Sequence, residues 1–447
     1  MNNGFFNFFN QIFIKKQGDG PYIQFGKYSD RNKTVEQLQY WKNSFILFNE
    51  KKYFIALENF FKYVKDPEIE NLSYELKDEK IHFKFFQGSK QVFGVADSKK
   101  IYAYSEIVKF DNLTDDFLKF VLESNHNLKF SKFSIDSKSN VLKLELNLIT
   151  NFSNPITLYS ALREIGIKAD EYDDKLIFKF PGLESINIGH IKPLSDYDIK
   201  IKIQYLRNWV EESLKIIEKY DSVKFVGARS FIILALIYRI YFLLSPEGEL
   251  LQEINRMHDI FYADNNKTDF ERNVLIIRKL ELLLTWSDER IQNSLYFVYS
   301  TFPVAPPVEP EVIIKFAQSE INKIHWYFDN EHKDIAIAIA EYIIGYASYN
   351  FGALPIISDI FAVFWEILHH KFFIDLKFSN IPYEKNNINY LLLNQIFNKI
   401  NTLGQKNYPN LNFNIKHLNL ANNNEFLMSY IYEFVNCDFS TEIEEQK

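Results

Sequence analysis

The first part of the chain changes from a helical to a strand pattern of hydrophobic positions. Residues 34–49 and 53–65 repeat apolar side chains at three- and four-residue steps, which predicts two helices. Four further segments alternate apolar and polar residues and are joined by turn sequences rich in Asp, Gly, Ser and Lys, the pattern of antiparallel hairpins. These predicted strands are 72–78, 80–87, 91–97 and 101–110.

A second block repeats this order on a smaller scale. A helix is predicted from about Thr114, because Asp115 and Asp116 would lie in its first turn, where the helix dipole favours acids. Two strands, 128–137 and 141–150, and a helix over 155–170 follow. The sequence therefore predicts an α+β domain over residues 34–190, one antiparallel sheet with helices on one face.

Two hairpins carry a resemblance to a known family. HFKFFQGSKQVFGVAD (82–97) and KFSKFSIDSKSNVLKLELNL (129–148), each followed by an amphipathic helix, resemble the type III secretion chaperone-like fold shared with the YbjN-type bacterial proteins. The resemblance is one of topology and covers about a third of the chain. It implies a domain that binds a partner protein or dimerises and catalyses nothing, although such chaperones are usually one domain and this chain continues.

Residues 191–435 show only helical patterns and predict an all-helical domain. A Pro-rich connector at 302–310 interrupts them, and its last proline is suited to begin the next helix. An acidic tail is predicted at 436–447, and its last part, STEIEEQK (440–447), is expected to be frayed. The predicted helices are 200–220, 225–245, 249–262, 267–284, 287–299, 310–328, 332–349, 355–372 and 386–402.

Two apolar stretches bear on membrane association. Residues 231–248 carry Arg239 in the middle of a run shorter than a membrane span, which favours a buried helix and no transmembrane segment. Residues 1–33 comprise an aromatic N-terminal segment and a Gly-rich lead. Drawn as a helix, that segment places four apolar residues on one face, which either docks on the protein's own core or lies in a membrane interface. These residues are Phe5, Phe9, Ile12 and Phe13.

Charge and cysteine content narrow the classes of partner. A net charge of −7 and a pI near 5.8 argue against a nucleic-acid partner, because phosphate binding needs a surplus of Lys and Arg. The single cysteine, Cys437, excludes an internal disulfide and fits a cytoplasmic location. No His lies near it in sequence, so we expect an inert thiol.

Motifs for catalysis and for metal or cofactor binding are weak. The sequence contains no G-x-G-x-x-G and no G-x-S-x-G, and no cofactor is expected. Glu366 and His369 have the i, i+3 spacing of di-iron bundles, but no second Glu-x-x-His is present. The histidines at 325 and 332 fit a solvated turn better than a metal site. The acidic run at 170–174 is expected to be a solvated helix end.

The aromatic residues of the predicted sheet are the best candidate binding residues. In strand 101–107, Ile101, Ala103, Ser105 and Ile107 share one face, and small Ala103 and Ser105 suit close packing by helices. The opposite face would carry aromatic side chains that are either covered by the rest of the chain or offered to a partner. These residues are Tyr102 and Tyr104, joined, depending on the register, by Phe86, Phe93 and His82.

Three functional hypotheses follow. The leading one is a non-catalytic cytoplasmic protein that binds another protein or itself, as a chaperone or scaffold. The alternative is a metal- or small-ligand-binding protein or enzyme with a site in the helical domain, near Glu366 and His369. The third is a peripheral membrane protein anchored through the N-terminal aromatic segment.

Overall fold

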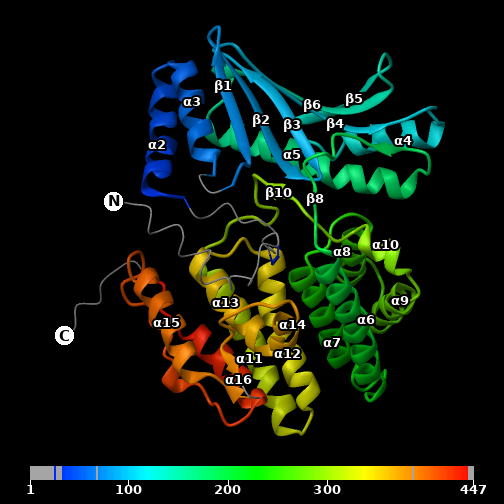
Figure 1. The fold of residues 1–447 in the computed structure, drawn as a ribbon, viewed down its shortest axis with the longest axis vertical. Helices are drawn as coiled ribbons and strands as arrows, with labels where there is room; N and C mark the ends of the chain where they lie inside the picture. Colours follow the sequence, from blue (N-terminus) through cyan, green and yellow to red (C-terminus); the bar gives the residue numbers. More distant parts are fainter. Residues whose placement is uncertain (1–24, 27–32, 67–68, 385–386, 441–447) are drawn as a thin grey trace.

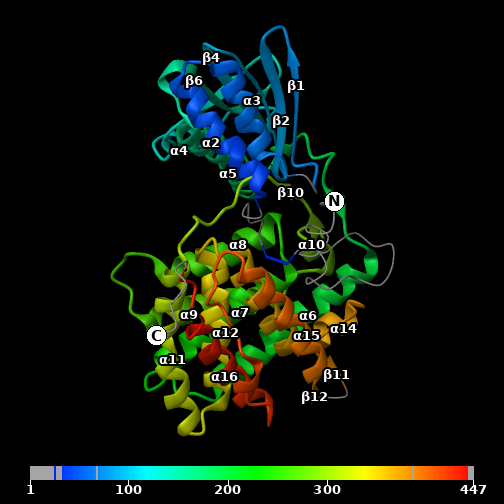
Figure 2. The same ribbon diagram turned by 90° about the vertical axis from the view of Figure 1, so that its left-hand side faces the viewer.

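The chain forms a sheet domain that lies on one end of a helical domain, with helix α5 (Pro155–Lys179) between the sheet and the helices (Figures 1 and 2). The structure is a computed structural model that describes residues 25–26, 33–66, 69–384 and 387–440. An antiparallel sheet with helices is followed by a mostly helical region, so the predicted fold class is confirmed.

The main sheet has the strand order β1-β2-β3-β4-β6-β5, and every neighbouring pair is antiparallel. The predicted hairpins are therefore all present, with the β4–β6 pair bringing the two hairpin blocks side by side. The strands are β1 Leu72–Lys77, β2 Lys80–Gly88, β3 Lys90–Ala96, β4 Lys100–Lys109, β5 Ser131–Asp136 and β6 Val141–Ile149.

Helix α5 covers the inner face of the sheet. Asn154 caps its N-terminus by accepting from the Thr157 amide, and Pro155 occupies the first turn, where a missing N–H is harmless. Its small and branched residues, such as Ala161 and Ile165, are fully buried against the strands. The other helices of this domain are α2 Val35–Asn49, α3 Tyr53–Val64 and α4 Asp115–Asn125, with a 3₁₀ turn at Thr150–Phe152.

The acidic run at 170–174 lies inside α5, so its expected place at a solvated helix end is wrong. Helix α5 continues to Lys179, and Asp173 turns toward the sheet, where its carboxylate lies 2.9 Å from the Lys90 ammonium. Lys90 is fully buried and also donates to the Ile107 and Ile186 carbonyls. A buried charge needs an opposite charge and hydrogen bonds, and Lys90 supplies them for Asp173.

The helical domain packs around helices that are hydrophobic on most sides, such as α7 and α13. Its helices are α6 Asp196–Glu218, α7 Val226–Arg239, α8 Gly248–Tyr262, α9 Asp269–Leu284, α10 Asp288–Gln292, α11 Pro310–Asp329, α12 Lys333–Asn350, α13 Pro355–Leu368, α14 His370–Asp375, α15 Tyr390–Gly404 and α16 Asn423–Val435. Short strands are β7 Glu184–Ser185, β8 Lys192–Pro193, β9 Tyr296–Phe297, β10 Tyr299–Ser300, β11 Tyr383–Glu384 and β12 Asn387–Ile388.

One helical stretch in the described part of the chain, Val226–Leu244, is long and apolar enough to cross a membrane. It comprises α7 and the π-helical turn that follows, and 67% of its apolar window is buried inside the protein. Arg239 within it forms an ion pair with Glu341 of α12. The stretch therefore packs as a core helix, and no clear transmembrane segment is found among the described residues.

Residues 299–304 belong to the sheet domain, although they lie between two helices of the helical domain in sequence. Strand β10 pairs with the end of β2, and the Gln87 side chain accepts from the amides of Thr301 and Phe302 and donates to the Phe302 carbonyl. The Phe302 ring is fully buried, with its centroid 5.4 Å from that of Phe85 and 5.1 Å from that of Tyr159. We call residues 299–304 the strap.

At the strap the structure differs from two predictions made from the sequence. The predicted helix 287–299 is wrong beyond Gln292, because residues 296–300 form β9 and β10 and find their hydrogen-bond partners in β8 and β2. The connector 302–310 contains no helix before Pro310, as expected, but its first residues are packed into the sheet domain.

The C-terminal end also differs from expectation. Helix α16 was not predicted, and Cys437 and Phe439 are buried after it, so the first residues of the acidic tail belong to the packed helical domain. The Phe439 ring lies 5.5 Å from that of Tyr408. Residues 441–447 lie outside the described residues.

Phe302→Ala should lower the free energy of unfolding by about 3–5 kcal/mol, because it leaves a cavity in the core of the sheet domain. The measurement is urea unfolding followed by circular dichroism. Phe152→Ala is the matched control, since Phe152 is 82% exposed and its loss should change stability by less than about 0.5 kcal/mol. Equal effects of the two substitutions would show that the strap adds nothing to the core.

Candidate functional site

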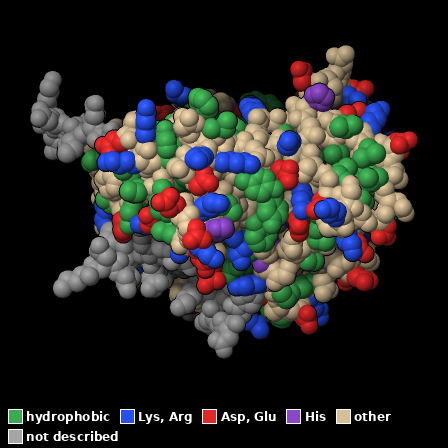
Figure 3. Space-filling view, turned by 90° about the horizontal axis from the view of Figure 1, so that it is seen from above, with side chains coloured by type: hydrophobic (Ala, Val, Ile, Leu, Met, Phe, Trp, Pro, Cys, Tyr) green, Lys and Arg blue, Asp and Glu red, His purple; other side chains and the backbone are tan. Residues whose placement is uncertain are grey.

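The sheet has one covered face and one face that points away from the helical domain (Figures 1 and 2). Ile101, Ala103, Ser105 and Ile107 are fully buried beneath α5, as predicted from their alternation. Lys100, Tyr102, Tyr104 and Glu106 of β4 point to the opposite side, which we call the outer face. Figure 3 views the molecule from this end and shows hydrophobic side chains gathered among charged ones.

Three of the predicted aromatic residues form one continuous surface on the outer face. Tyr104 lies directly opposite Phe93 in the β3–β4 register, and their rings are stacked with centroids 5.7 Å apart. Tyr102 and Tyr104 are also stacked, at 5.9 Å. No described element outside the sheet packs on these rings. We call Phe93, Tyr102 and Tyr104 the aromatic trio.

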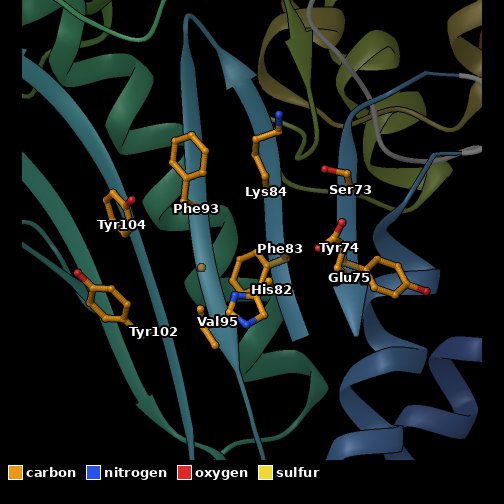
Figure 4. Close-up of a pocket in the computed structure, with 11 residues that line it drawn as sticks. Ser73, Tyr74, Glu75, His82, Phe83, Lys84, Phe93, Val95, Tyr102 and Tyr104 are labelled. Atoms are coloured by element: carbon orange, nitrogen blue, oxygen red, sulfur yellow. The ribbon is translucent and has the colours of Figure 1, made fainter. Parts of the chain in front are cut away.

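The aromatic trio lines a shallow groove of about 460 Å³ that crosses four strands. Lys84, Phe93 and Tyr104 stand side by side on neighbouring strands, and Tyr102 follows Tyr104 along β4 (Figure 4). Outer-face residues of β1 and β2 close the other side of the groove. The side chains lining it from this face are Ser73, Glu75, His82, Lys84, Phe93, Val95, Tyr102 and Tyr104.

A hydrogen bond to an acidic side chain fixes the orientation of the Tyr102 ring. Its hydroxyl donates to Oε1 of Glu145 on β6 at 2.9 Å. Partial burial and this carboxylate raise the pKa of Tyr102 to about 12, so the phenol stays neutral and keeps its proton for the bond. The ring is therefore held in place before any partner arrives, which lowers the entropy that binding must overcome.

Lysine side chains lie around the aromatic trio. The Lys100 ammonium is 5.4 Å from the centre of the Tyr102 ring, and Lys143 is 5.7 Å from that of Tyr104. Lys143 is neutralised by Asp136 at 2.8 Å and by Glu106 at 3.7 Å. Lys84 and Lys100 form no ion pair with any described residue.

Phe86 is on the same face but does not join the aromatic trio. Its ring stacks on His190 with centroids 4.7 Å apart and lies 6.2 Å from the ring of Tyr299 in β10. The His190 ring nitrogen Nε2 lies 3.1 Å from the Gly88 carbonyl oxygen. Phe86 therefore helps to hold the chain after α5 and the strap against the sheet.

The β5 edge of the sheet is closed to strand addition. The Phe133 amide donates to Oδ1 of Asn125, and the Ser131 amide donates to Oε1 of Glu164. Edge strands often pair with another chain unless such groups are already satisfied. A partner is therefore better received on the outer face than along β5.

Glu366 and His369, the two residues proposed as a metal pair, have different partners in the helical domain. His369 Nε2 lies 2.9 Å from Oε1 of Glu341, and Arg239 binds both oxygens of the same carboxylate. Burial raises the pKa of Glu341, but Arg239 and His369 outweigh it and hold the pKa at about 2. Glu366 has no part in this ion cluster, and no group of three or more metal-ligating side chains occurs in the described part of the chain.

Glu366 lies instead near a second buried acid, Asp359, two turns earlier on α13. Both oxygens of Asp359 are buried without a hydrogen-bond partner among the described residues. Burial raises the pKa of Asp359 to about 8, and burial together with Asp359 raises that of Glu366 well above its usual value. Both carboxyls are more stable in the protonated form, because no positively charged neighbour would neutralise the buried carboxylate.

The remaining predicted residues have structural surroundings. His325 is exposed on α11, and His332 packs between the rings of Tyr220 and Phe225. Cys437 is buried, which raises the pKa of its thiol and fits an inert side chain. Phe5, Phe9, Ile12 and Phe13 lie outside the described residues, so a membrane role for them stays a prediction.

Sequence reasoning missed Lys84, Lys100 and Glu145 as parts of the outer face. Their alternation with Phe85, Ile101 and Leu144 is visible in the sequence, and a hairpin register would have placed them. Comparison with protein-family models and with curated proteins finds no match to this chain. The site is therefore interpreted from its own geometry.

The contribution of Asp359 to the stability of the protein should fall as pH rises from about 4 to about 8. Asp359 keeps its proton in the folded state up to pH about 8, whereas in the unfolded chain it loses it near pH 4, so unfolding releases a proton in this window. The loss due to Asp359 is on the order of 4 kcal/mol at pH 7. Urea unfolding between pH 4.5 and 8 should show a smaller fall for Asp359→Asn.

Asp111→Asn is the control for this experiment, because Asp111 is exposed in the loop after β4. It should leave the pH dependence of the wild type unchanged. An unaltered fall in Asp359→Asn would mean that this carboxyl is ionised in the fold and has a compensating partner.

Proposed function

We propose that this protein is a non-catalytic protein-binding protein, chaperone-like or scaffold-like, whose partner docks on the outer face of the sheet. The observation that carries the proposal is the aromatic trio, whose rings are stacked, whose Tyr102 is oriented by Glu145, and on which no described element outside the sheet packs. Partly buried aromatic side chains that line a groove in this way are the type most often found at the energetic centre of protein interfaces.

The architecture supports this use of the outer face. Helix α5 and the strap fill the inner side of the sheet with packed side chains, so the strands form a rigid platform. Rigid surfaces change little on binding and lose little entropy. The resemblance to secretion chaperone-like domains favours the same class of function, and the single buried thiol of Cys437 fits a cytoplasmic location.

The test is affinity purification of the full-length protein from its native cell, comparing the wild type with Tyr102→Ser/Tyr104→Ser. Proteins enriched by the wild type are identified by mass spectrometry, and the strongest is purified and titrated by calorimetry. Loss of two aromatic anchors should weaken its affinity at least about thirtyfold, because such residues contribute about 2 kcal/mol or more at interface centres.

Trp326→Ser/Tyr432→Ser is the matched control. Both residues are exposed aromatic side chains, 56% and 57% accessible, and both lie on the helical domain. Binding of the partner should survive in this variant. Equal binding by the wild type, the outer-face variant and the control, with all three folded by circular dichroism, would contradict the proposal.

A further inference from the structure

The charges at the two ends of the aromatic trio indicate what kind of segment fits it. Lys84 is directly opposite Phe93 in the β2–β3 register, and Lys100 is two residues before Tyr102 on β4. Both ammonium groups lie near an aromatic ring, at 5.3 Å from Phe86 and 5.4 Å from Tyr102. Neither has a carboxylate partner among the described residues.

The path between these two lysines is apolar. It runs from Lys84 across Phe93 to Tyr104, then along β4 past Tyr102 to Lys100. Two strand spacings and four residues along a strand place the two lysine Cα atoms roughly 16 Å apart. An extended peptide covers this distance in about five residues.

The acids of the outer face leave these two positive ends free. Asp136 and Glu106 share the single ammonium of Lys143, and Glu145 keeps its negative charge while it accepts from the Tyr102 hydroxyl. Glu75, opposite His82 on β1, lies beyond the Lys84 end and would repel an acidic segment that continued that way. The charged groups at the two ends of the path, Lys84 and Lys100, are thus positive and without an ion-pair partner among the described residues, whereas the chain carries a net charge of −7.

We propose that the occupant of the outer face is an extended segment of a partner protein with two carboxylates about five residues apart and large apolar side chains between them. This inference rests on the proposed function and specifies its partner. One carboxylate pairs with Lys84 and the other with Lys100, while the apolar side chains cover the aromatic trio.

A peptide fits these observations better than a single-stranded nucleic acid. Nucleic-acid grooves carry a row of basic residues that follows a phosphate at every nucleotide, as well as stacking aromatics. Next to the aromatic trio the outer face offers two lysines without an ion pair among the described residues, Lys84 and Lys100, which lie at separate ends and do not form a row, with carboxylates of β4, β5 and β6 nearby. The negative charge of the whole chain also repels a polyanion at long range.

The test is selection of a phage-displayed library of random 12-residue peptides on the full-length protein, with counter-selection on Tyr102→Ser/Tyr104→Ser. The expected result is enrichment of peptides with Asp or Glu four to six residues apart around aromatic or aliphatic side chains. A synthetic peptide of the enriched sequence is then titrated by fluorescence anisotropy against the wild type and variants.

Lys84→Gln and Lys100→Gln should each weaken binding of this peptide about fivefold. Added salt should weaken binding by the wild type, but not binding by the double variant Lys84→Gln/Lys100→Gln. Lys138→Gln, in the exposed turn between β5 and β6, is the control and should bind as the wild type does. Replacing both acids of the peptide by amides should reduce binding as much as the double lysine substitution.

The contrary outcomes separate this inference from the proposed function. Outer-face-dependent peptides without paired acids, or lysine variants that bind normally, would overturn the inference and leave protein binding at this face intact. A library that yields no peptide dependent on the aromatic trio would contradict both. Tighter binding of oligo(dT) or oligo(U) than of any selected peptide would replace the peptide with a nucleic acid as the occupant.

Discussion

The side chain of Gln87 joins two parts of the chain that lie more than two hundred residues apart. By pairing with the backbone of Thr301 and Phe302, it brings the strap into the sheet and lets the Phe302 ring complete the core beneath β2. The backbone groups of the strap would be costly to bury without these bonds. This contact helps to hold the sheet domain on the helical domain, together with the packing of α5 against α8.

The two faces of the sheet follow from the alternation of side chains along each strand. Small and branched residues such as Ala103 admit α5 closely on one side, and the same alternation puts Tyr102 and Tyr104 on the other. The stacked rings and the oriented phenol have the aromatic enrichment of an interface centre, and the lysines at the two ends of the trio suit its polar rim. The blocked β5 edge then leaves this face, and not strand addition at β5, as the place for a partner.

The helical domain buries two sets of ionisable side chains, and the neighbours of each set decide whether its members are charged in the folded protein. Arg239, Glu341 and His369 neutralise one another in the interior, where a single unpaired member would be expensive. Asp359 and Glu366 have no such neighbours, and burial keeps them protonated instead. One turn of sequence separates Glu366 from His369, yet the two residues face different partners and do not form the metal pair that their spacing suggests.

The sequence by itself determined the elements and faces that depend on local periodicity. The strands, their turns and the helix starts at Thr34, Thr114 and Asn154 were readable, because alternation, turn residues and caps act within a few positions. The residues of β4 that face α5, and those that face the opposite side, could be predicted for the same reason. The register that joined Phe93 to the two tyrosines needed the hairpins to be correctly aligned, and it was left open.

Only the tertiary structure decided the contacts between distant segments. The strap was expected to be a helix end and a connector, because its hydrogen-bond partners in β2 are far away in sequence. The acids at 170–174 have the sequence pattern of a solvated helix end, and only the fold places Lys90 beside Asp173. The separation of Glu366 from His369, and the partial accessibility of the aromatic trio, likewise depend on which elements pack together, since burial and pairing are properties of the assembled fold.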